Sequence, residues 1–594
     1  MYDEKIEGLL SLAMEQTPSE RLNNPDFAET KNDLVEVIVK YSGGLASLRQ
    51  ANPNWNILEL LSEYAIIKLP ITEVDLLASD PGIIYIELSK RLYFEVEQGR
   101  SASCMTAVQT DPTRPASNTN LNGEGVLVAI LDSGIDFTHP DFRNEDGSTR
   151  ILVLWDQTAV SITDRNAFDD NALFATYTSQ FGGRIYSREQ INEALSSDPS
   201  LVPEFDRSGH GTHVAGIAAG NGAASGGRNR GVAYRSELVI VKLGSPSASD
   251  FPRTTQLMSA VDFSIRYALS IGRPIAINIS IGNNYGSHSG TSLLETYLSS
   301  AGNIWKNSIV VGSGNEAAQR IHTSGKLKTG PEIVELAVAS YEPGFAIQLW
   351  KNYVDTFTIE LQTPTNTPPI RLPVVPGIHR IRTGSANLRV FFGEPSPYQP
   401  FQEIFLELLP ADSNLYLPSG IWTFTLIPKS IKDGTYDFWL PAGGIISPAT
   451  GFLQPTPSTT LTIPSTAENV ISVGAYDSRS NTPASFSGRG FTWQYDQAKP
   501  DLVAPGVNIL SCAPGGLYTT RTGTSMAAPF VTGSAALLMQ WGILLGNDPY
   551  LYGNKIKAYL WKGARPLPAQ SVYPNPQLGW GALCLADSFP DLTL

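Results

Sequence analysis

Four short apolar runs constrain the fold of this 594-residue chain more than any other feature of its sequence. The runs are Val126–Leu131, Leu238–Leu243, Ile275–Ile281 and Ile309–Gly312. A strand that is apolar along its whole length is buried on both faces, which is typical of a parallel sheet between two layers of helices. We therefore predict an α/β domain with a mostly parallel sheet and helices on both faces from about residue 122 to 320, and the pattern resumes after Ala467.

Two further segments have patterns of their own. Residues from about 33 to 88 have the order β-α-β-β-α-β, which is typical of a small ferredoxin-like module. Between about 325 and 460, proline-rich loops join strands with period-two alternation, such as Phe357, Ile359 and Leu361. This insertion is predicted to be an all-β sandwich of jelly-roll type. It holds no cluster of acids, histidines or basic residues that indicates a second active site, so we expect a structural or docking role.

The composition excludes several classes of partner and location. A net charge of -14 argues against nucleic acid, because the chain has no overall basic field to neutralise phosphates. Met1–Pro18 surrounds a short apolar run with acids and lacks the basic start of a signal peptide, so we expect an intracellular protein. The longest apolar run elsewhere, Ala535–Leu545, is short and contains Gln540, so no membrane span is expected.

The chain has three cysteines, Cys104, Cys512 and Cys584. Three residues cannot form a disulfide framework, and none of them has the C-x-x-C spacing of a zinc or redox site. We expect reduced or buried thiols and no metal site.

An extended segment, Lys90–Gln98, follows the ferredoxin-like module and lacks helical periodicity. Such a segment can lie in a groove as an added β-strand, or it can be an ordinary linker. The residues alone leave both interpretations open.

Candidate catalytic residues lie at strand ends and helix starts. Sites in open parallel sheets lie beyond the carboxyl ends of the strands, where Asp132, Ser280 and Asn315 fall. His210 begins an apolar helix between glycines, although a satisfied core histidine would give the same pattern. Ser525 stands where a turn becomes a helix, and it could be only a cap. A nucleophilic serine needs a base, a group that orients the base, and donors for the oxyanion.

Taken together, these residues carry a family resemblance. The motifs are V-A-I-L-D-S-G-I-D at Asp132, G-H-G-T-H-V-A-G at His210 and G-T-S-M-A-A-P at Ser525. The chain thus resembles the subtilisin-like serine proteases, whose triad has the chain order Asp, His, Ser. The resemblance implies Ser525 as nucleophile, His210 as general base and then acid, and Asp132 as the group that holds the imidazole. It also implies an oxyanion hole made by the Asn315 amide and the backbone N–H of Ser525.

The same resemblance implies substrate contacts and a propeptide. Ser280, Ile281 and Gly282 would pair with the substrate backbone, and Gly312, Ser313 and Gly314 would line the first specificity pocket. The ferredoxin-like module looks like a subtilase propeptide that ends in the active-site groove, with Gln98-Gly99 as the expected autocleavage bond. The implied domains are a propeptide at 1–98, catalytic parts at 99–324 and 461–594, and the β insertion at 325–460. The chemistry needs no cofactor, and no calcium site can be assigned from the sequence.

Three features narrow the subfamily: no signal peptide, the β insertion, and an expanded interval between Asp132 and His210. All three resemble the Csp-type germination proteases of clostridial spores, which implies spore association and limited proteolysis of a cortex-lytic enzyme precursor. Two alternatives remain open. One is a propeptide-inhibited scaffold or germination signalling protein, and the other is a general intracellular subtilase unrelated to spores.

Overall fold

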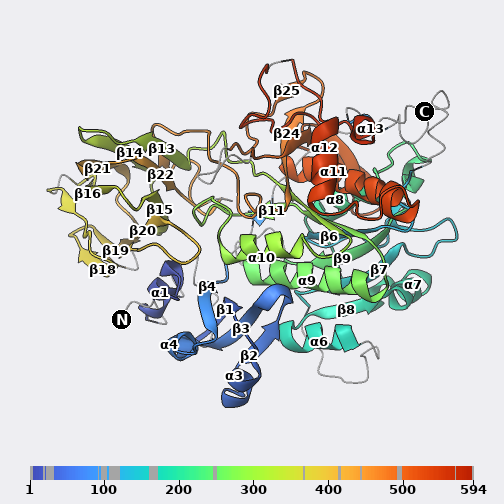
Figure 1. The fold of residues 1–594 in the computed structure, drawn as a ribbon, viewed down its shortest axis with the longest axis horizontal. Helices are drawn as coiled ribbons and strands as arrows, with labels where there is room; N and C mark the ends of the chain where they lie inside the picture. Colours follow the sequence, from blue (N-terminus) through green and yellow to red (C-terminus); the bar gives the residue numbers. More distant parts are fainter. Residues whose placement is uncertain are drawn as a thin grey trace. The chain divides into compact units, whose positions relative to one another are not determined.

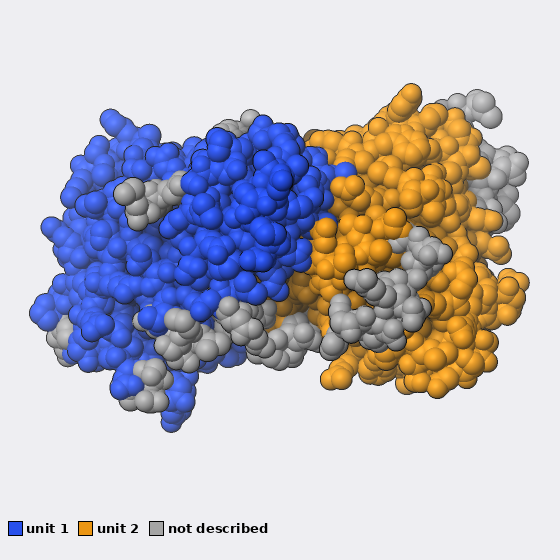
Figure 2. Space-filling view, turned by 90° about the horizontal axis from the view of Figure 1, so that it is seen from below, with its two compact units in different colours: residues 1–91, 283–294, 316–463 blue, residues 92–282, 295–315, 464–594 orange. Residues whose placement is uncertain are grey.

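The computed structural model describes most of the chain, in the ranges 4–17, 21, 33–90, 93–94, 103–105, 121–159, 172–244, 251–365, 368–412, 416–441, 444–490, 498–568 and 570–590. Its contacts divide the chain into two compact units, coloured separately in Figure 2. Unit 1 contains Met1–Arg91, Asn283–Leu294 and Glu316–Ile463. Unit 2 contains Leu92–Gly282, Glu295–Asn315 and Pro464–Leu594.

A nine-stranded sheet forms the centre of unit 2 (Figure 1). Its order is β25-β24-β12-β10-β6-β9-β7-β8, and β26 also pairs with β24. The strands are β6 (Leu127–Asp132), β7 (Ile151–Asp156), β8 (Arg184–Ser187), β9 (Glu237–Lys242), β10 (Ile275–Ile279), β12 (Asn307–Gly312), β24 (Ile471–Asp477), β25 (Thr482–Pro483) and β26 (Leu502–Pro505). Only the pairs β7–β8 and β24–β25 are antiparallel. The predicted mostly parallel sheet is therefore confirmed.

Helices cover both faces of this sheet, because each face of a buried strand is apolar. Val128 and Ile130 of β6 share a core with helices α8 (His210–Ala219) and α11 (Thr524–Met539). The alternate residues of β6 point to the opposite face, where α9 (Thr254–Ser270) packs against β6 and β10. The other helices of unit 2 are α6 (Ala172–Phe181), α7 (Arg188–Ser196), α12 (Asn554–Gly563) and α13 (Leu585–Ser588), and α10 (Leu293–Ala301) begins in unit 1 and ends in unit 2.

The helix that begins at Thr524 is buried along its whole length, from Thr524 to Met539. With the π-helical turn η9 (Gln540–Leu544) it continues to Leu544, and by length and composition it could cross a membrane. However, 83% of its most apolar 18-residue segment is buried inside the protein. This is the environment of a core helix.

Unit 1 begins with the small module expected from the sequence. Its elements are β1 (Leu34–Tyr41), α3 (Ala46–Ala51), β2 (Asn56–Glu59), β3 (Tyr64–Pro70), α4 (Val74–Ala78) and β4 (Ile83–Leu88). The strands form an antiparallel sheet in the order β2-β3-β1-β4. A further helix, α1 (Gly8–Met14), precedes them and buries Leu9, Leu10 and Leu12 in the same core.

The insertion contains two antiparallel sheets. One has the order β13-β22-β15-β20-β19-β18, and the other β17-β16-β21-β14-β23. The strands are β13 (His322–Lys326), β14 (Glu332–Val338), β15 (Phe345–Asn352), β16 (Thr356–Gln362), β17 (Ile370–Arg371), β18 (Gly377–Arg382), β19 (Ala386–Phe392), β20 (Phe401–Pro410), β21 (Gly420–Ser430), β22 (Thr435–Trp439) and β23 (Gly451–Phe452). Phe438 of the first sheet packs against Phe424 and Phe452 of the second, so the sheets meet face to face.

The insertion and the N-terminal module share one apolar core. Ala346, Phe391 and Phe405 of the insertion belong to the same buried cluster as the strands and helices of the module. At Gly8 the approach is so close that a Cβ atom would lie 2.1 Å from the ring of Phe391. Within unit 1, the insertion therefore packs directly against the N-terminal module, a contact that is compatible with the docking role expected for it.

The cysteines differ from the sequence expectation. Cys104 and Cys584 form a disulfide across 480 residues of sequence, so the prediction of reduced thiols is wrong for this pair. The pairing depends on a tertiary contact, in which the backbone N–H of Leu585 donates to Ser103 O at 3.1 Å. Cys512 is a free, buried thiol.

Candidate active site

Asp132 and His210 form the first part of the site, from two elements of unit 2. Asp132 ends β6 and His210 begins α8, and His210 Nδ1 lies 2.6 Å from Asp132 Oδ1. Both side chains are buried. The backbone N–H of Ser133 donates to the same carboxylate oxygen at 2.7 Å. A carboxylate on Nδ1 fixes the tautomer in which Nδ1 carries the proton, and it leaves Nε2 as the basic nitrogen.

Ser525 lies in the first turn of α11, where its backbone and side chain both contact Ser280. Ser525 Oγ donates to Ser280 O at 3.2 Å, and Ser280 Oγ donates to Ser525 O at 3.2 Å. The two reciprocal bonds fix the start of the helix beside the end of the strand that precedes Ser280. Attack on a substrate requires the hydroxyl to turn from this carbonyl toward an imidazole nitrogen.

Asn315 is held by the residue before Ser525. The backbone N–H of Thr524 donates to Asn315 Oδ1 at 3.0 Å, and Thr524 Oγ1 donates to the same oxygen at 3.4 Å. Thr524 Oγ1 also accepts the N–H of Gly314 at 3.1 Å. These bonds hold the amide oxygen, so the Nδ2 group is the one that remains for donation to an oxyanion. The sequence motif contains Thr524, but its role as the support of Asn315 was not predicted.

The predicted substrate strand already has a partner in the chain. Strand β11 (Ile281–Gly282) pairs antiparallel with β5 (Tyr93–Phe94), with Ile281 opposite Phe94 and Gly282 opposite Tyr93. Of the two interpretations of the extended segment, a β-strand ligand is therefore the one observed at Tyr93–Phe94. The expected cleavage residues, Gln98 and Gly99, lie outside the described residues.

Gly312, Ser313 and Gly314 form a compact connection between β12 and Asn315. A Cβ atom at Gly312 would lie 3.3 Å from backbone and side-chain atoms of Thr524, so the strand end and the start of α11 are in close contact. Ser313 N donates to Val473 O at 2.9 Å. Gly314 has φ +99°, which favours glycine, and its carbonyl accepts the N–H of Gly488 at 2.7 Å. The wall predicted for the first pocket is thus fixed by backbone hydrogen bonds.

A second histidine, His213, lies one turn beyond His210 and has a different environment. Burial, together with the nearby charges of Arg521 and His210, lowers the pKa of His213 to about 3. Its Nε2 lies 3.1 Å from Ile509 O and 3.2 Å from Thr519 O. A neutral imidazole that donates to backbone carbonyls is structural, so His210 is the histidine of this motif that can act as a base.

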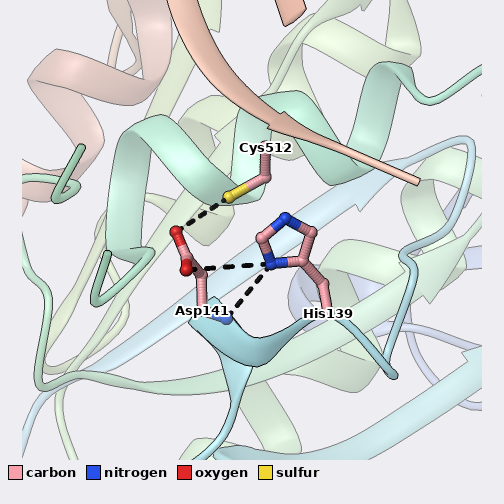
Figure 3. A group of neighbouring side chains, drawn as sticks. All are labelled: His139, Asp141 and Cys512. Carbon is pink, nitrogen blue, oxygen red and sulfur yellow. Dashed lines mark hydrogen bonds and ion pairs between the residues drawn. The ribbon is translucent and has the colours of Figure 1, made fainter. Parts of the chain in front are cut away.

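His139, Asp141 and Cys512 form a compact group of possible metal ligands (Figure 3). Cys512 Sγ donates to Asp141 Oδ2 at 3.3 Å, and the hydroxyl of Tyr518 donates to the same oxygen at 2.8 Å. The backbone N–H of Asp141 donates to His139 Nδ1 at 3.1 Å. Burial and the carboxylate raise the pKa of Cys512, which favours the thiol that makes this bond. The group is therefore best described as a hydrogen-bond network that already uses its ligand atoms.

Comparison with known proteins identifies both parts of the chain. The model of the "Subtilase family" matches residues 123–367 and 447–581, and the model of the "Csp protease B prodomain" matches residues 4–90. The solved structure of the Clostridium perfringens CspB protease is 39% identical, with a TM-score of 0.72, and the match covers 82% of this chain and 95% of that one.

Other relatives match different shares of the chain. The PI-type proteinase of Lactococcus lactis subsp. cremoris is 24% identical over 531 residues, which is 82% of this chain but only 26% of the proteinase. The serine protease AprX of Bacillus subtilis is 38% identical over 142 residues, which is 20% of this chain and 30% of AprX. This chain thus spans about a quarter of the length of the lactococcal proteinase. The chain belongs to the subtilase family, as its three motifs predicted, and it is a subtilisin-like serine peptidase preceded by a Csp-type prodomain.

Proposed function

We propose that this chain is a serine endopeptidase that cuts its own propeptide once, between Gln98 and Gly99, and then cleaves a limited set of protein substrates. The observation that carries the proposal is the pairing of β5 with β11, because it lays the chain's own backbone on the expected substrate strand. The bond of 2.6 Å between His210 and Asp132 supplies the base that such a reaction needs.

The proposed chemistry follows from these positions. Ser525 Oγ attacks the carbonyl carbon of the scissile peptide, and its proton passes to His210 Nε2. Asp132 stabilises the imidazolium, while the Asn315 amide and the Ser525 backbone N–H donate to the oxyanion. Cleavage of the C–N bond transfers the proton from His210 to the leaving amine. Water then attacks the acyl-enzyme with His210 again as base, which releases the new carboxyl end and restores Ser525.

We further propose that the cut propeptide stays bound and limits activity. The support is the apolar core that α1 and the module strands share with the insertion. A product strand held in this way competes with substrates at a high effective concentration. The insertion would then act as the docking platform for the inhibitor.

We assign the insertion to the jelly-roll type. The chain crosses repeatedly between the two sheets: β13, β15, β18–β20 and β22 lie in one, and β14, β16, β17, β21 and β23 lie in the other. Repeated crossing between two antiparallel sheets is typical of jelly rolls.

A role in spore germination is the most specific form of the proposal. It is supported by likeness to the CspB protease in both the prodomain and the catalytic part. In this form the substrate is the precursor of a cortex-lytic enzyme, and the protease resides inside the cell or the spore. The competing proposals are a propeptide-inhibited signalling scaffold and a general intracellular subtilase.

The decisive comparison is between the wild-type chain and Ser525→Ala. We expect wild type to appear as two fragments, with the second beginning at Gly99 by N-terminal sequencing, and Ser525→Ala to remain one chain. Self-cleavage by Ser525 would be contradicted if wild type and Ser525→Ala both remain uncut, or if both are cut at the same bond. A fluorophosphonate probe then separates the alternatives: labelling of the processed chain supports an open enzyme, and processing without labelling supports the inhibited scaffold. Incubation with a cortex hydrolase precursor tests the germination role separately.

A further inference from the structure

We propose that Asp206 is a positioning residue for the catalytic pair, because its carboxylate joins the turn after Asp132 to the first turn of the helix that carries His210. The inference rests on the proposed protease function. Asp206 lies outside the three family motifs as the sequence delimits them, and it is fully buried four residues before His210.

The Asp206 carboxylate is an acceptor on both of its oxygens. Oδ1 accepts Ser133 Oγ at 2.8 Å, Ser208 Oγ at 3.0 Å and the N–H of Gly209 at 3.0 Å. Oδ2 accepts the N–H and the hydroxyl of Thr212, each at 2.8 Å. Gly209 is the N-cap of α8 and Thr212 lies in its first turn. One side chain therefore satisfies orphan donors of the helix start that its glycine N-cap has no side chain to reach.

The same network reaches the catalytic aspartate. Ser133, which follows Asp132, donates to Asp206 through its hydroxyl and accepts the N–H of Gly211 on that hydroxyl at 3.0 Å. The backbone N–H of Ser133 in turn holds Asp132 Oδ1. On the helix side, Ser208 Oγ accepts the N–H of His210 at 3.0 Å. Asp206 thus touches a neighbour of Asp132 and neighbours of His210 on either side.

A second link connects the strand loop to the helix through Thr212. Thr212 Oγ1 donates to Asp206 and accepts the N–H of Asp136 at 2.9 Å. The loop after β6 is therefore bound to α8 at Ser133 and again at Asp136, and both bonds depend on groups that Asp206 orients. Loss of the carboxylate would leave the Ser133 and Thr212 hydroxyls without this acceptor, so the groups that align Asp132 with His210 would be held less firmly.

This arrangement predicts a defect in the chemical step. A displacement of about 1 Å in a catalytic group can reduce turnover about a hundredfold. The groups that bond to the Asp206 carboxylate are donors, so an alanine removes their acceptor. Asparagine keeps one oxygen and turns an NH2 group toward the remaining donors. We expect the rates to follow the order wild type, Asp206→Asn, Asp206→Ala.

The test uses the full chain and two readouts that a merely structural role would not change together. The first is the rate of self-cleavage after cell-free synthesis, which does not depend on substrate affinity because the scissile bond is in the same chain. The second is kcat per active site on a peptide substrate, with active sites counted by fluorophosphonate titration. For Asp206→Ala we expect both rates to fall by about tenfold to a hundredfold, with KM changed by less than about twofold. The rates of Asp206→Asn should lie between those of wild type and Asp206→Ala.

Asp262→Asn is the matched control, because Asp262 is another buried carboxylate of unit 2 and bonds to Tyr177 of α6, Arg266 of α9 and Tyr297 of α10. It should leave the rate per active site unchanged. The inference is overturned if Asp206→Ala lowers the count of active sites or the thermal midpoint while its rate per site equals that of wild type. It is equally overturned if Asp262→Asn shows the same loss per site. If wild type itself is neither cut nor labelled, the proposed function has failed instead.

Discussion

The ammonium nitrogen of Lys90 lies 2.7 Å from a carboxylate oxygen of Glu7, and this ion pair joins the end of the propeptide sheet to the residue before α1. Glu87 is 3.1 Å from the same nitrogen. Burial by itself lowers the pKa of Lys90, but the two carboxylates outweigh it and raise the pKa overall. Glu403 of the insertion interacts with this group: burial and the charge of Glu7 raise its pKa, Lys90 opposes the rise, and the resulting pKa is about 8. The propeptide and the insertion thus meet at a buried set of charges.

Unit 1 should be most stable in acid and should weaken as the pH rises through 7 and 8. Burial raises the pKa of Glu7 to about 7 and that of Glu403 to about 8, from an ordinary value of 4.5. The folded state therefore binds more protons than the unfolded state above pH 4.5, so its stability falls with increasing pH. Denaturant unfolding followed from pH 5.5 to 8.5 measures this slope. Glu403→Gln imitates the protonated acid, so it should flatten the dependence of stability on pH at the alkaline end of this range. An identical slope in that variant would contradict the role of Glu403.

Gly8→Ala should loosen the propeptide after cleavage. The new Cβ would lie 2.1 Å from the Phe391 ring, and overpacking of this kind costs about 1–3 kcal/mol. That cost corresponds to about fivefold to 150-fold weaker retention, measured as the fraction of propeptide that remains bound after dilution and gel filtration. Gly44→Ala is the control, because no atom lies within 4 Å of its Cβ position. Equal retention in both variants would exclude the α1–Phe391 contact as a determinant.

Asn315→Ala should affect turnover and leave binding almost unchanged. Removal of one oxyanion donor lowers kcat by about a hundredfold to a thousandfold, because the donor acts on charge that exists only in the transition state. Steady-state kinetics on a peptide substrate separate kcat from KM. A rise in KM at constant kcat would show instead that Asn315 only binds substrate. Asn303→Ala, at an exposed position of unit 2, should match wild type.

Cys104→Ser should destabilise the catalytic unit only under oxidising conditions. Removal of a native disulfide typically costs about 2–5 kcal/mol. The thermal midpoint of the oxidised wild type should therefore exceed that of the variant, and a reductant should bring the two together. A wild-type midpoint that does not respond to reductant would indicate that the thiols are reduced in solution.

Local patterns were sufficient to predict the parallel sheet and the family, and the structure brings the predicted Asp132 and His210 together. The apolar run that precedes Asp132 indicates a strand that is buried on both faces. Each of the three motifs contains, within a few residues, the sequence signals for its own turn or helix start. The features that were missed depend on distant contacts. Helix α1 has only seven residues and is stabilised by packing against a strand of the insertion, so its short apolar run gave no signal of its own. Asp206 is a single aspartate whose bond to Ser133 forms only when the loop after β6 and the start of α8 come together.

The link between Cys104 and Cys584 has a consequence for how damage to this protein would be seen. Nearly the whole catalytic chain lies between these two residues. A single break of the backbone anywhere in that interval leaves both pieces covalently attached, so no fragment is released under non-reducing conditions. Toward foreign proteases the oxidised chain behaves as a closed ring, from which only two cuts can remove a segment.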